Sequence, residues 1–265
     1  MSFLSTTSRV VGWFARLPLP WPISRITVGI FAWWYGIDTA AADKPIGAYN
    51  SIGAFFIRDL KPELRPIGGG LVSPVDGTIR SIERVNNGEL IQVKAIKYSL
   101  ASLLGDAELA AEFSGAHCWN MYLSPQDAHH IFAPVSGKIT TTIHIPGTLW
   151  PVNDWALNNV PQLFCVNERV VTVIESDLGK IVLVSVGALN VGMITLHYTS
   201  LTTNLCKRVA TNKIPHQPAP AVTRGEKIAT FNMGSSVILL TKAEALEPQK
   251  LYGKIRYGAT LSKNS

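Results

Sequence analysis

The sequence predicts an α+β protein whose core is a compact β-rich sandwich and whose first residues form helices. Two observations support this prediction. From about Leu71 onward, short β-branched runs are separated by Gly, Pro and Asn, a texture typical of β-rich domains. The residues before that point instead place apolar and aromatic side chains at helical spacing. Strands that alternate with little helix also disfavour a doubly wound α/β architecture.

Size and composition limit what the chain can be. A chain of 265 residues that is 47% hydrophobic can bury a full core, and its length fits one domain with a short appendage. Charged residues make up 16% and the mean hydropathy is +0.19, which is apolar for a soluble protein and too polar for a multi-span membrane protein. This balance indicates contact with a bilayer.

Charge and cysteine usage narrow the classes of partner. A net charge of +6 suits any anionic surface, but the sequence has no Lys/Arg cluster interleaved with aromatics, so nucleic acid is not an expected partner. Cys118, Cys165 and Cys206 form no CxxC pair, which disfavours a disulfide framework or a zinc site and favours a reducing compartment. We expect no metal.

Two helical stretches are expected before the β-rich region. Residues 5–17 combine apolar side chains with two arginines in the pattern of an interfacial amphipathic helix, and residues 23–35 carry aromatic side chains of the kind enriched at the headgroup level. The longest apolar stretch, 26–37, is shorter than the roughly 20 residues of a spanning helix, and no clean secretory signal precedes it. We therefore expect interfacial helices in 1–50 and the main domain in 51–265. Simple capping of the core by these helices is the alternative.

The β-rich region contains several strand patterns, one helical pattern and one long loop. Strands are expected at 77–82, 89–93, 137–145, 169–174 and 180–186. A short helix is expected within 99–113. Residues 207–224 are polar and proline-rich without any period, so we expect a surface loop there.

A turn phrase recurs along this region. PVDGTI at 74–79 returns as PVSGKI at 134–139, and RGEKIATF at 224–231 again leads from a glycine turn into a strand. These phrases resemble the barrel-sandwich hybrid of biotinyl and lipoyl carrier domains, so we expect a core of that character. A carrier role is disfavoured, because no lysine stands at a MetLysMet-like hairpin tip.

The segment FNMGSSVILL at 231–240 carries the most chemical information, because a Gly-Ser step lies between apolar residues. A serine can attack the carbonyl that precedes it and shift the acyl group from nitrogen to oxygen. The ester eliminates, because a carboxylate leaves more readily than an amide nitrogen, and the dehydroalanine that remains hydrolyses to a pyruvoyl group. Gly234 offers Ser235 an unhindered carbonyl. On this motif alone, an ordinary turn before a strand is the commoner interpretation.

A series of short blocks between about 51 and 240 changes that balance. The blocks are FIRDLKPELRP (56–66), SPVDG (73–77), VKAIKYSL (93–100), YLSPQDAHH (122–130), PGTLWPVN (146–153), NVPQLFCVNERV (159–170), VGALNVG (186–192), RGEK (224–227) and GSS (234–236). In this order they resemble the phosphatidylserine decarboxylase family, which has its Gly-Ser-Thr or Gly-Ser-Ser cleavage site at the last block.

The resemblance implies that the bond between Gly234 and Ser235 is cut. The β chain would end at Gly234, and the small α chain would begin with Ser235 converted to a pyruvoyl group, so that 51–265 is the catalytic domain. The pyruvoyl carbonyl would capture the amine of phosphatidylserine and accept the electrons left when carbon dioxide departs, which gives phosphatidylethanolamine. No metal and no pyridoxal phosphate would be needed.

The same resemblance, together with the basic charge and the aromatic N-terminus, predicts the surroundings of the protein. We expect it to bind an anionic phospholipid membrane that contains phosphatidylserine. We expect it on the periphery of a membrane, at the cytoplasmic face of a bacterial inner membrane. The α and β chains would form a heterodimer, and a homodimer is left open.

The family pattern also implies catalytic residues beside Ser235. The family has an Asp in its SPxDG phrase and a His-x-x-His pair, of which the first histidine serves decarboxylation and the second joins the Asp in a triad like that of serine proteases. Asp76 and His129 match this pattern, but Phe132 stands at the second histidine position. His130 and His144 are the candidates to replace it, and His130 faces the other side if this stretch is a strand.

Phe132 leaves three interpretations open. His129 or His130 takes over the cleavage role in a slower enzyme, or the chain is an unprocessed, catalytically silent membrane-binding homologue, or it acts on another amine-bearing lipid. Asn153 and Asn158 lie in the loop that the family places near the active site. We expect them to contact the carboxylate or phosphate of the headgroup.

Overall fold

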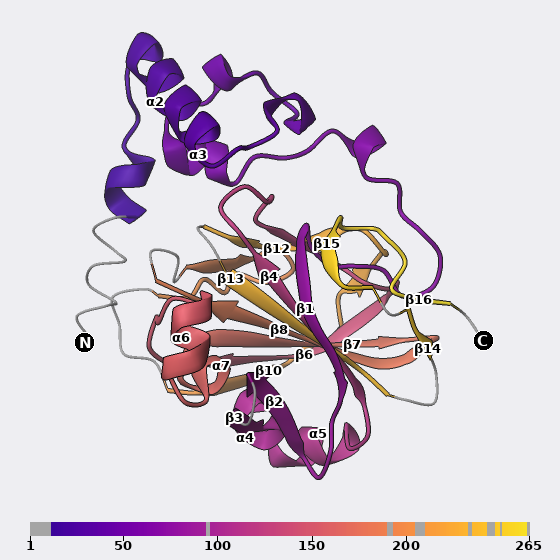
Figure 1. Ribbon diagram of the computed structural model, residues 1–265. Coiled ribbons are helices and arrows are strands. Elements are labelled where there is room, and N and C mark those ends of the chain that lie inside the picture. The colour runs from indigo at the N-terminus through magenta and orange to yellow at the C-terminus, as the bar shows by residue number, and fades with distance from the viewer. Residues whose placement is uncertain are drawn as a thin grey trace.

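The computed structural model describes residues 12–93, 96–189, 193–204, 210–232, 235–242, 247–249 and 251–263. The protein is α+β and rich in strands, as the sequence predicted. A large antiparallel sheet forms the central layer, a small sheet covers one of its faces, and short helices with a hairpin cover the other (Figure 1).

The central sheet has nine strands in the order β10-β6-β7-β8-β13-β4-β1-β15, with β11 paired to β6. Its strands are β1 (Gly77–Arg84), β4 (His117–Leu123), β6 (Gly137–Ile145), β7 (Arg169–Ser176), β8 (Gly179–Gly187), β10 (Asn212–Pro215), β11 (Ala221–Val222), β13 (Ser235–Thr241) and β15 (Gly253–Ile255). β8 and β13 read as nearly continuous apolar runs, because both faces of these inner strands are covered.

The strands of the central sheet do not close on themselves. β10 and β15 form its two edges, and no pairing joins them in the part of the chain that the structure describes. Closure into a barrel requires the first and last strands to pair. The expected sandwich is present as packed layers, whereas the barrel component of the expectation is corrected to an open sheet.

The small sheet has the order β5-β12-β9, from β5 (His130–Phe132), β12 (Lys227–Phe231) and β9 (Ile194–Leu196). Its apolar residues, including Ile131 and Phe231, pack with Trp119 and Leu239 of the central sheet in one buried cluster. A second cluster fills the opposite face, beneath α4 (Leu100–Leu104), α5 (Ala107–Glu112), α6 (Asp154–Asn159), α7 (Leu163–Val166), β2 (Glu89–Val93) and β3 (Ile96–Ser99). A further pair joins β14 (Glu247–Pro248) to β16 (Ser262–Lys263).

The N-terminal helices form a separate group, which we call the cap (residues 12–64). It contains a helical turn at 12–16, α2 (Trp21–Trp34), α3 (Ile52–Phe56) and the 3-10 turns η1 (Thr39–Ala41), η2 (Ile46–Ala48) and η3 (Pro62–Leu64). Val28 and Ala32 of α2 are buried against Phe55 of α3. Figure 1 shows the cap in indigo, beyond the layer that holds β12. None of the described helices has the length and apolarity that crossing a membrane requires.

Most element predictions are confirmed with small changes of boundary. β2 and β6 match the expected ranges, β1, β7 and β8 are slightly longer, and α2 begins two residues earlier than expected. The helix expected within 99–113 is two helices, because Gly105 adopts a left-handed conformation (φ 64°) and Asp106 caps α5 through the Leu109 N–H. Residues 5–11 of the first predicted helix lie outside the described residues.

The loop expected at 207–224 contains two short strands. β10 and β11 both pair with β6, at the edge of the central sheet. Residues 207–209 lie outside the described part of the chain. The prediction was wrong for 212–215 and 221–222 because both segments are held by backbone pairing with a distant strand, a contact that the local sequence pattern does not signal.

Candidate active site

The proposed cleavage position lies where the chain passes from the small sheet into the centre of the large one. β12 ends at Phe231, and β13 begins at Ser235 between β4 and β8. Gly234 lies outside the described residues. The backbone of Ser235 is paired with Leu123 at the end of β4 and with Gly187 at the end of β8. The Gly-Ser step is therefore at the end of the sheet where both neighbouring strands stop.

A buried asparagine fixes one neighbour of Ser235. The side chain of Asn167 donates from Nδ2 to the Gly187 carbonyl at 2.9 Å and to the Trp150 carbonyl at 2.9 Å. Its Oδ1 accepts from the Trp150 N–H at 2.9 Å. The Gly187 N–H in turn donates to the Glu168 carbonyl at 2.8 Å. Apart from its place inside one of the family-like blocks, no sequence pattern points to Asn167.

His129 is a fully buried histidine directly before β5. Its ring is fully buried and packs against Phe56 of the cap, with the ring centroids 3.9 Å apart. Its backbone carbonyl accepts from the Phe231 N–H at 2.8 Å, at the end of the strand that leads to Ser235. His129 therefore connects the cap, the small sheet and the start of the Gly-Ser segment.

The hydrogen bonds of His129 determine its tautomer. Nδ1 lies 2.9 Å from the Asp127 carbonyl oxygen, and because a carbonyl only accepts, Nδ1 carries the proton. Nε2 then has a lone pair, and it has no partner among the described residues. Burial lowers the pKa of His129 to about 3, so the ring is neutral near pH 7. A buried, unprotonated nitrogen is thus available to a group placed beside it.

His130 belongs to a different environment, because successive residues of β5 face opposite sides. Its Nδ1 lies 2.9 Å from Thr230 Oγ1, which also lies 2.8 Å from Nε2 of His197. Its Nε2 is 3.2 Å from Asp59 Oδ1 but without hydrogen-bond alignment. Burial, followed by the charge of Lys227, lowers the pKa of His130 to about 4. Its described polar contacts are thus with Thr230 and the cap.

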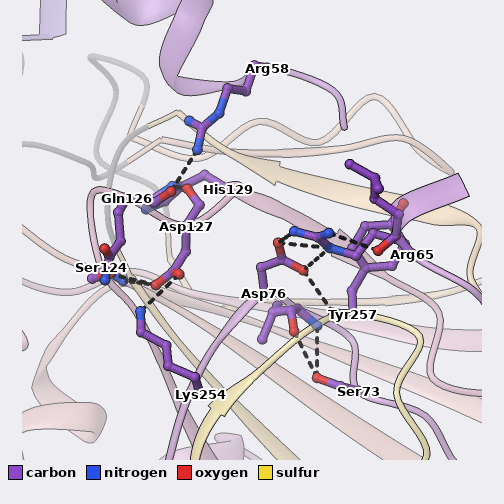
Figure 2. Close-up of polar contacts among 12 residues, drawn as sticks. Arg58, Arg65, Ser73, Asp76, Ser124, Gln126, Asp127, His129, Lys254 and Tyr257 are labelled. Atoms are coloured by element: carbon purple, nitrogen blue, oxygen red, sulfur yellow. Dashed lines mark hydrogen bonds and ion pairs between the residues drawn. The ribbon is translucent and has the colours of Figure 1, made fainter. Parts of the chain in front are cut away.

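Asp76 is engaged by an arginine rather than a histidine. Arg65 donates to the carboxylate from Nη2 at 2.6 Å and from Nε at 3.0 and 3.1 Å, and both side chains are almost fully buried. The Tyr257 N–H donates to Asp76 Oδ1 at 2.9 Å. Figure 2 shows this group on one side, with Asp127 and His129 on the other. Neither His129 nor His130 is among the described hydrogen-bond partners of Asp76.

Phe132 fills the space beside this carboxylate group. Its ring stacks on Tyr257, with centroids 3.7 Å apart and planes 11° apart. Its backbone N–H donates to the Pro74 carbonyl at 2.8 Å, in the turn that carries Asp76. The position that the family pattern gives to the triad histidine is therefore close to Asp76, but an apolar ring occupies it.

Three other candidate residues have local partners. Asn153 caps α6 by accepting from the Ala156 N–H at 3.0 Å, and Asn158 donates to the Asp154 carbonyl at 2.6 Å. His144 Nε2 lies 2.9 Å from Glu168 Oε1, and both side chains are buried. The predicted headgroup contacts of the two asparagines stay predictions.

The described residues contain no group of three or more His, Cys, Asp or Glu side chains arranged around a shared point for a metal ion. The residue that would carry a pyruvoyl group is Ser235 itself. The sequence pattern singled out neither Arg65 nor Asn167, although both stand within family-like blocks.

Comparison with known proteins places the chain among closely similar sequences. A family model described as phosphatidylserine decarboxylase matches residues 52–263. The phosphatidylserine decarboxylase proenzyme of Myxococcus xanthus (strain DK1622) is 40% identical over 239 residues, which cover 89% of this chain and 85% of the relative. The proenzyme of the same name from Anaeromyxobacter sp. (strain K) is 40% identical over 262 residues, 96% of this chain and 92% of the relative. The proenzyme of the same name from Brevibacillus brevis (strain 47) is 40% identical over 232 residues, which cover 85% of this chain and 82% of the relative.

Proposed function

Because the chain belongs to the phosphatidylserine decarboxylase family, we propose that it converts phosphatidylserine to phosphatidylethanolamine and carbon dioxide with a pyruvoyl group made from its own Ser235. It is an enzyme of the carboxy-lyase class. The observation that carries the proposal is the extent of the match, 52–263, which includes the Gly-Ser step at 234–235. The names of the relatives contain the word proenzyme, which denotes a precursor that is later converted.

The proposed maturation uses only atoms of the chain and water. Ser235 Oγ attacks the Gly234 carbonyl carbon, and the acyl group moves from the amide nitrogen to oxygen as an ester. Removal of the Ser235 Cα proton expels the Gly234 carboxylate and leaves dehydroalanine. Water replaces the nitrogen of that residue, so ammonia is released and a pyruvoyl group remains at the new chain end.

The surroundings of Ser235 fit such a group. When present, a pyruvoyl carbonyl supplies an electron sink for the loss of a carboxylate. β13 is an inner strand held by both β4 and β8, so the chain end created by cleavage keeps its position. The Phe231 N–H donates to the His129 carbonyl, and this bond holds the end of β12, from which the chain leads to Ser235.

We assign the proton transfer of decarboxylation to His129. The carbon that loses the carboxyl group must receive a proton, and a residue that carries it must lie in a site closed to bulk water. His129 is fully buried and its Nε2 has no described partner. Because burial lowers its pKa to about 3, His129 is unprotonated in the free enzyme, and the proton that it passes to the carbon would come from the ammonium group of the bound substrate.

The cap is the proposed membrane-binding surface. Trp33 and Trp34 of α2 are 78% and 73% exposed. The other large apolar side chains that the cap exposes are Trp13, Phe14, Trp21, Ile23, Ile26, Ile30, Tyr35 and Leu64. Aromatic side chains favour the headgroup level of a bilayer, and the net charge of +6 favours anionic lipids. We propose peripheral binding at the cytoplasmic face of a bacterial inner membrane, with the α and β chains as a heterodimer.

The alternative of a catalytically silent homologue gains no support. The relatives that cover most of this chain carry the name of an enzyme precursor. Phe132 alone motivated that alternative, and His129, whose backbone carbonyl accepts from the Phe231 N–H, has a buried Nε2 without a partner among the described residues.

The test is a pair of serine variants of the full chain. Ser235→Ala should leave one intact chain, whereas the parent and Ser236→Ala should give two chains, the smaller blocked by a pyruvoyl group in mass spectrometry. Decarboxylation of phosphatidylserine in vesicles should disappear with Ser235→Ala. Parent protein that stays uncleaved and inactive would overturn the proposal. Cleavage that is lost in Ser236→Ala but kept in Ser235→Ala would assign the cleavage site to Ser236 instead.

A further inference from the structure

A charged cleft lies between the cap and the end of the central sheet. It has a volume of about 180 Å³. Gly36 and Asp38 after α2, Arg58 after α3, and the loop at 126–128 contribute to its walls, with Lys254 and Arg256 from the C-terminal region. Figure 2 shows Arg58 and Lys254 on opposite sides of the loop that carries Gln126 and Asp127. Binding sites for whole drug-sized ligands are usually about 300 Å³ or larger, so this cleft suits a small polar group.

The charges in the cleft do not balance. Arg58, Arg65, Lys254 and Arg256 face Asp38, Asp76 and Asp127, an excess of one positive charge. Arg65 is neutralised by Asp76, and Lys254 lies 3.2 Å from Asp127 Oδ1. Within the described ranges, Arg58 and Arg256 have no ion pair with a carboxylate.

Arg58 is a buried cation that lacks a direct counter-ion. Arg58 is 3% exposed, and its partners among the described residues are the carbonyls of Gln126, at 2.7 Å, and Phe55, at 3.5 Å. Its Nε has no partner among the described residues. A buried charge without a compensating anion is costly, so an anion in the adjoining cleft would stabilise it.

We propose that this cleft binds a phosphate monoanion through Arg58 and Arg256, presented either as the phosphodiester of a lipid headgroup or as free phosphate. Arginine suits this ligand because its planar guanidinium offers several N–H donors to phosphate oxygens. The exposed aromatic end of α2, at Trp33 and Trp34, leads directly to Gly36 in the cleft wall. A lipid that stays in the bilayer could therefore place its headgroup here, an assignment that rests on the proposed membrane function.

Binding is tested with the full chain carrying Ser235→Ala, which cannot consume a substrate. Calorimetric titration with inorganic phosphate and with glycerophosphoserine should each show saturable binding. Arg256→Gln should weaken it about tenfold, the effect of losing one charge-assisted hydrogen bond. Arg256 is exposed, so this variant should fold as the parent does. Lys138→Gln removes an exposed positive charge elsewhere on the surface and should leave the affinity unchanged.

The two probes distinguish the sources of phosphate. Glycerophosphoserine that binds at least about tenfold more tightly than inorganic phosphate assigns the cleft to a lipid headgroup, and equal or weaker binding assigns it to the free ion. Absence of saturation with both probes, or equal affinities of Arg256→Gln and Lys138→Gln, overturns the proposal. Self-cleavage is scored separately in the chain with Ser235 intact, so failure of the enzymatic function leaves these titrations interpretable.

Discussion

At the scale of single residues, the chain departs from the family pattern at Phe132, and this departure changes what surrounds Asp76. Phe132 stacks on Tyr257, whose N–H donates to Asp76, and Arg65 binds both oxygens of the same carboxylate. A carboxylate that accepts these bonds is held in place. The proposed self-cleavage would then take its base from elsewhere, and Nε2 of His129 has no partner among the described residues.

Phe132→His should accelerate self-cleavage. An imidazole at this position would lie beside Asp76 and supply a general base, and a general base typically contributes about a hundredfold or more in rate. Loss of the aromatic stack should cost about 1 kcal/mol of stability. The fraction of cleaved chain is followed over time after synthesis on denaturing gels. Phe132→Leu, which also loses the stack but adds no base, is the control, and equal rates for the two variants would contradict the prediction.

At the scale of elements, the recurring turn phrase has a steric reason. Its glycines, Gly77 and Gly137, open β1 and β6. A Cβ on Gly137 would lie 2.2 Å from the Glu175 carbonyl oxygen, and one on Gly77 would lie 2.6 Å from that of Tyr122. In both repeats the backbone of the neighbouring strand occupies the place of a side chain, so glycine is required for close pairing.

Gly137→Ala should therefore destabilise the protein, by about 1–3 kcal/mol, because backbone atoms must move to admit the methyl group. Gly29→Ala is the matched control, since a Cβ there meets nothing within 4 Å and the residue lies inside α2. That control should stabilise by about 0.5–1 kcal/mol. Urea unfolding of both variants measures the two effects, and a neutral Gly137→Ala would show that the strands can separate without penalty.

The exposed face of α2 allows a second prediction at this scale. Replacing Trp33 and Trp34 with serine should weaken binding to anionic vesicles by at least about tenfold for each residue, because each indole contributes more than 1 kcal/mol on burial. Sedimentation with phosphatidylglycerol vesicles gives the bound fraction. Trp155→Ser is the control, since Trp155 is 59% exposed but belongs to α6. An equal loss of vesicle binding in the Trp33 and Trp34 variants and in Trp155→Ser would contradict a specific role of the cap in membrane binding.

The elements were more predictable than the contacts between them. β2 and β6 could be located because β-branched residues and flanking turns are local signals. β10 could not, because Asn212–Pro215 is polar and its pairing with β6 depends on a segment far away in sequence. The site shows the same limit: the Gly-Ser step and His129 stand in recognisable phrases, whereas the bond from Arg65 to Asp76 arises only when the chain folds.

At the scale of the whole molecule, the cap and the small sheet enclose both adjacent histidines. Phe56 covers His129, and Asp59 lies near His130 while binding Lys227. Burial lowers the pKa of His129 to about 3 and that of His130 to about 4. In an unfolded chain both would titrate near 6.5. The junction between cap and core is therefore sensitive to acid.

The free energy of unfolding should fall as the pH decreases from about 6.5 to 4. In this range the unfolded state binds protons that the folded state excludes, at about 1.4 kcal/mol per pH unit for each fully titrating histidine. His129→Asn should lower the dependence of the unfolding free energy on pH by up to the contribution of one titrating histidine. His197→Asn, at a more exposed position, should lower it less. Denaturant unfolding at several pH values measures the slopes, and identical slopes for parent and His129→Asn would contradict the burial argument.

The central position of β13 affects how the protein can fold before and after the proposed cleavage. The precursor brings this strand between β4 and β8 while the backbone is continuous, so assembly is a first-order process. If the bond before Ser235 is broken as proposed, the same strand then belongs to a second polypeptide, and reassembly after denaturation would depend on protein concentration. The proposed reaction would also consume the original serine. Under this proposal only the newly made precursor folds as a single chain, and a denatured mature enzyme would have no route back through the reaction that produced it.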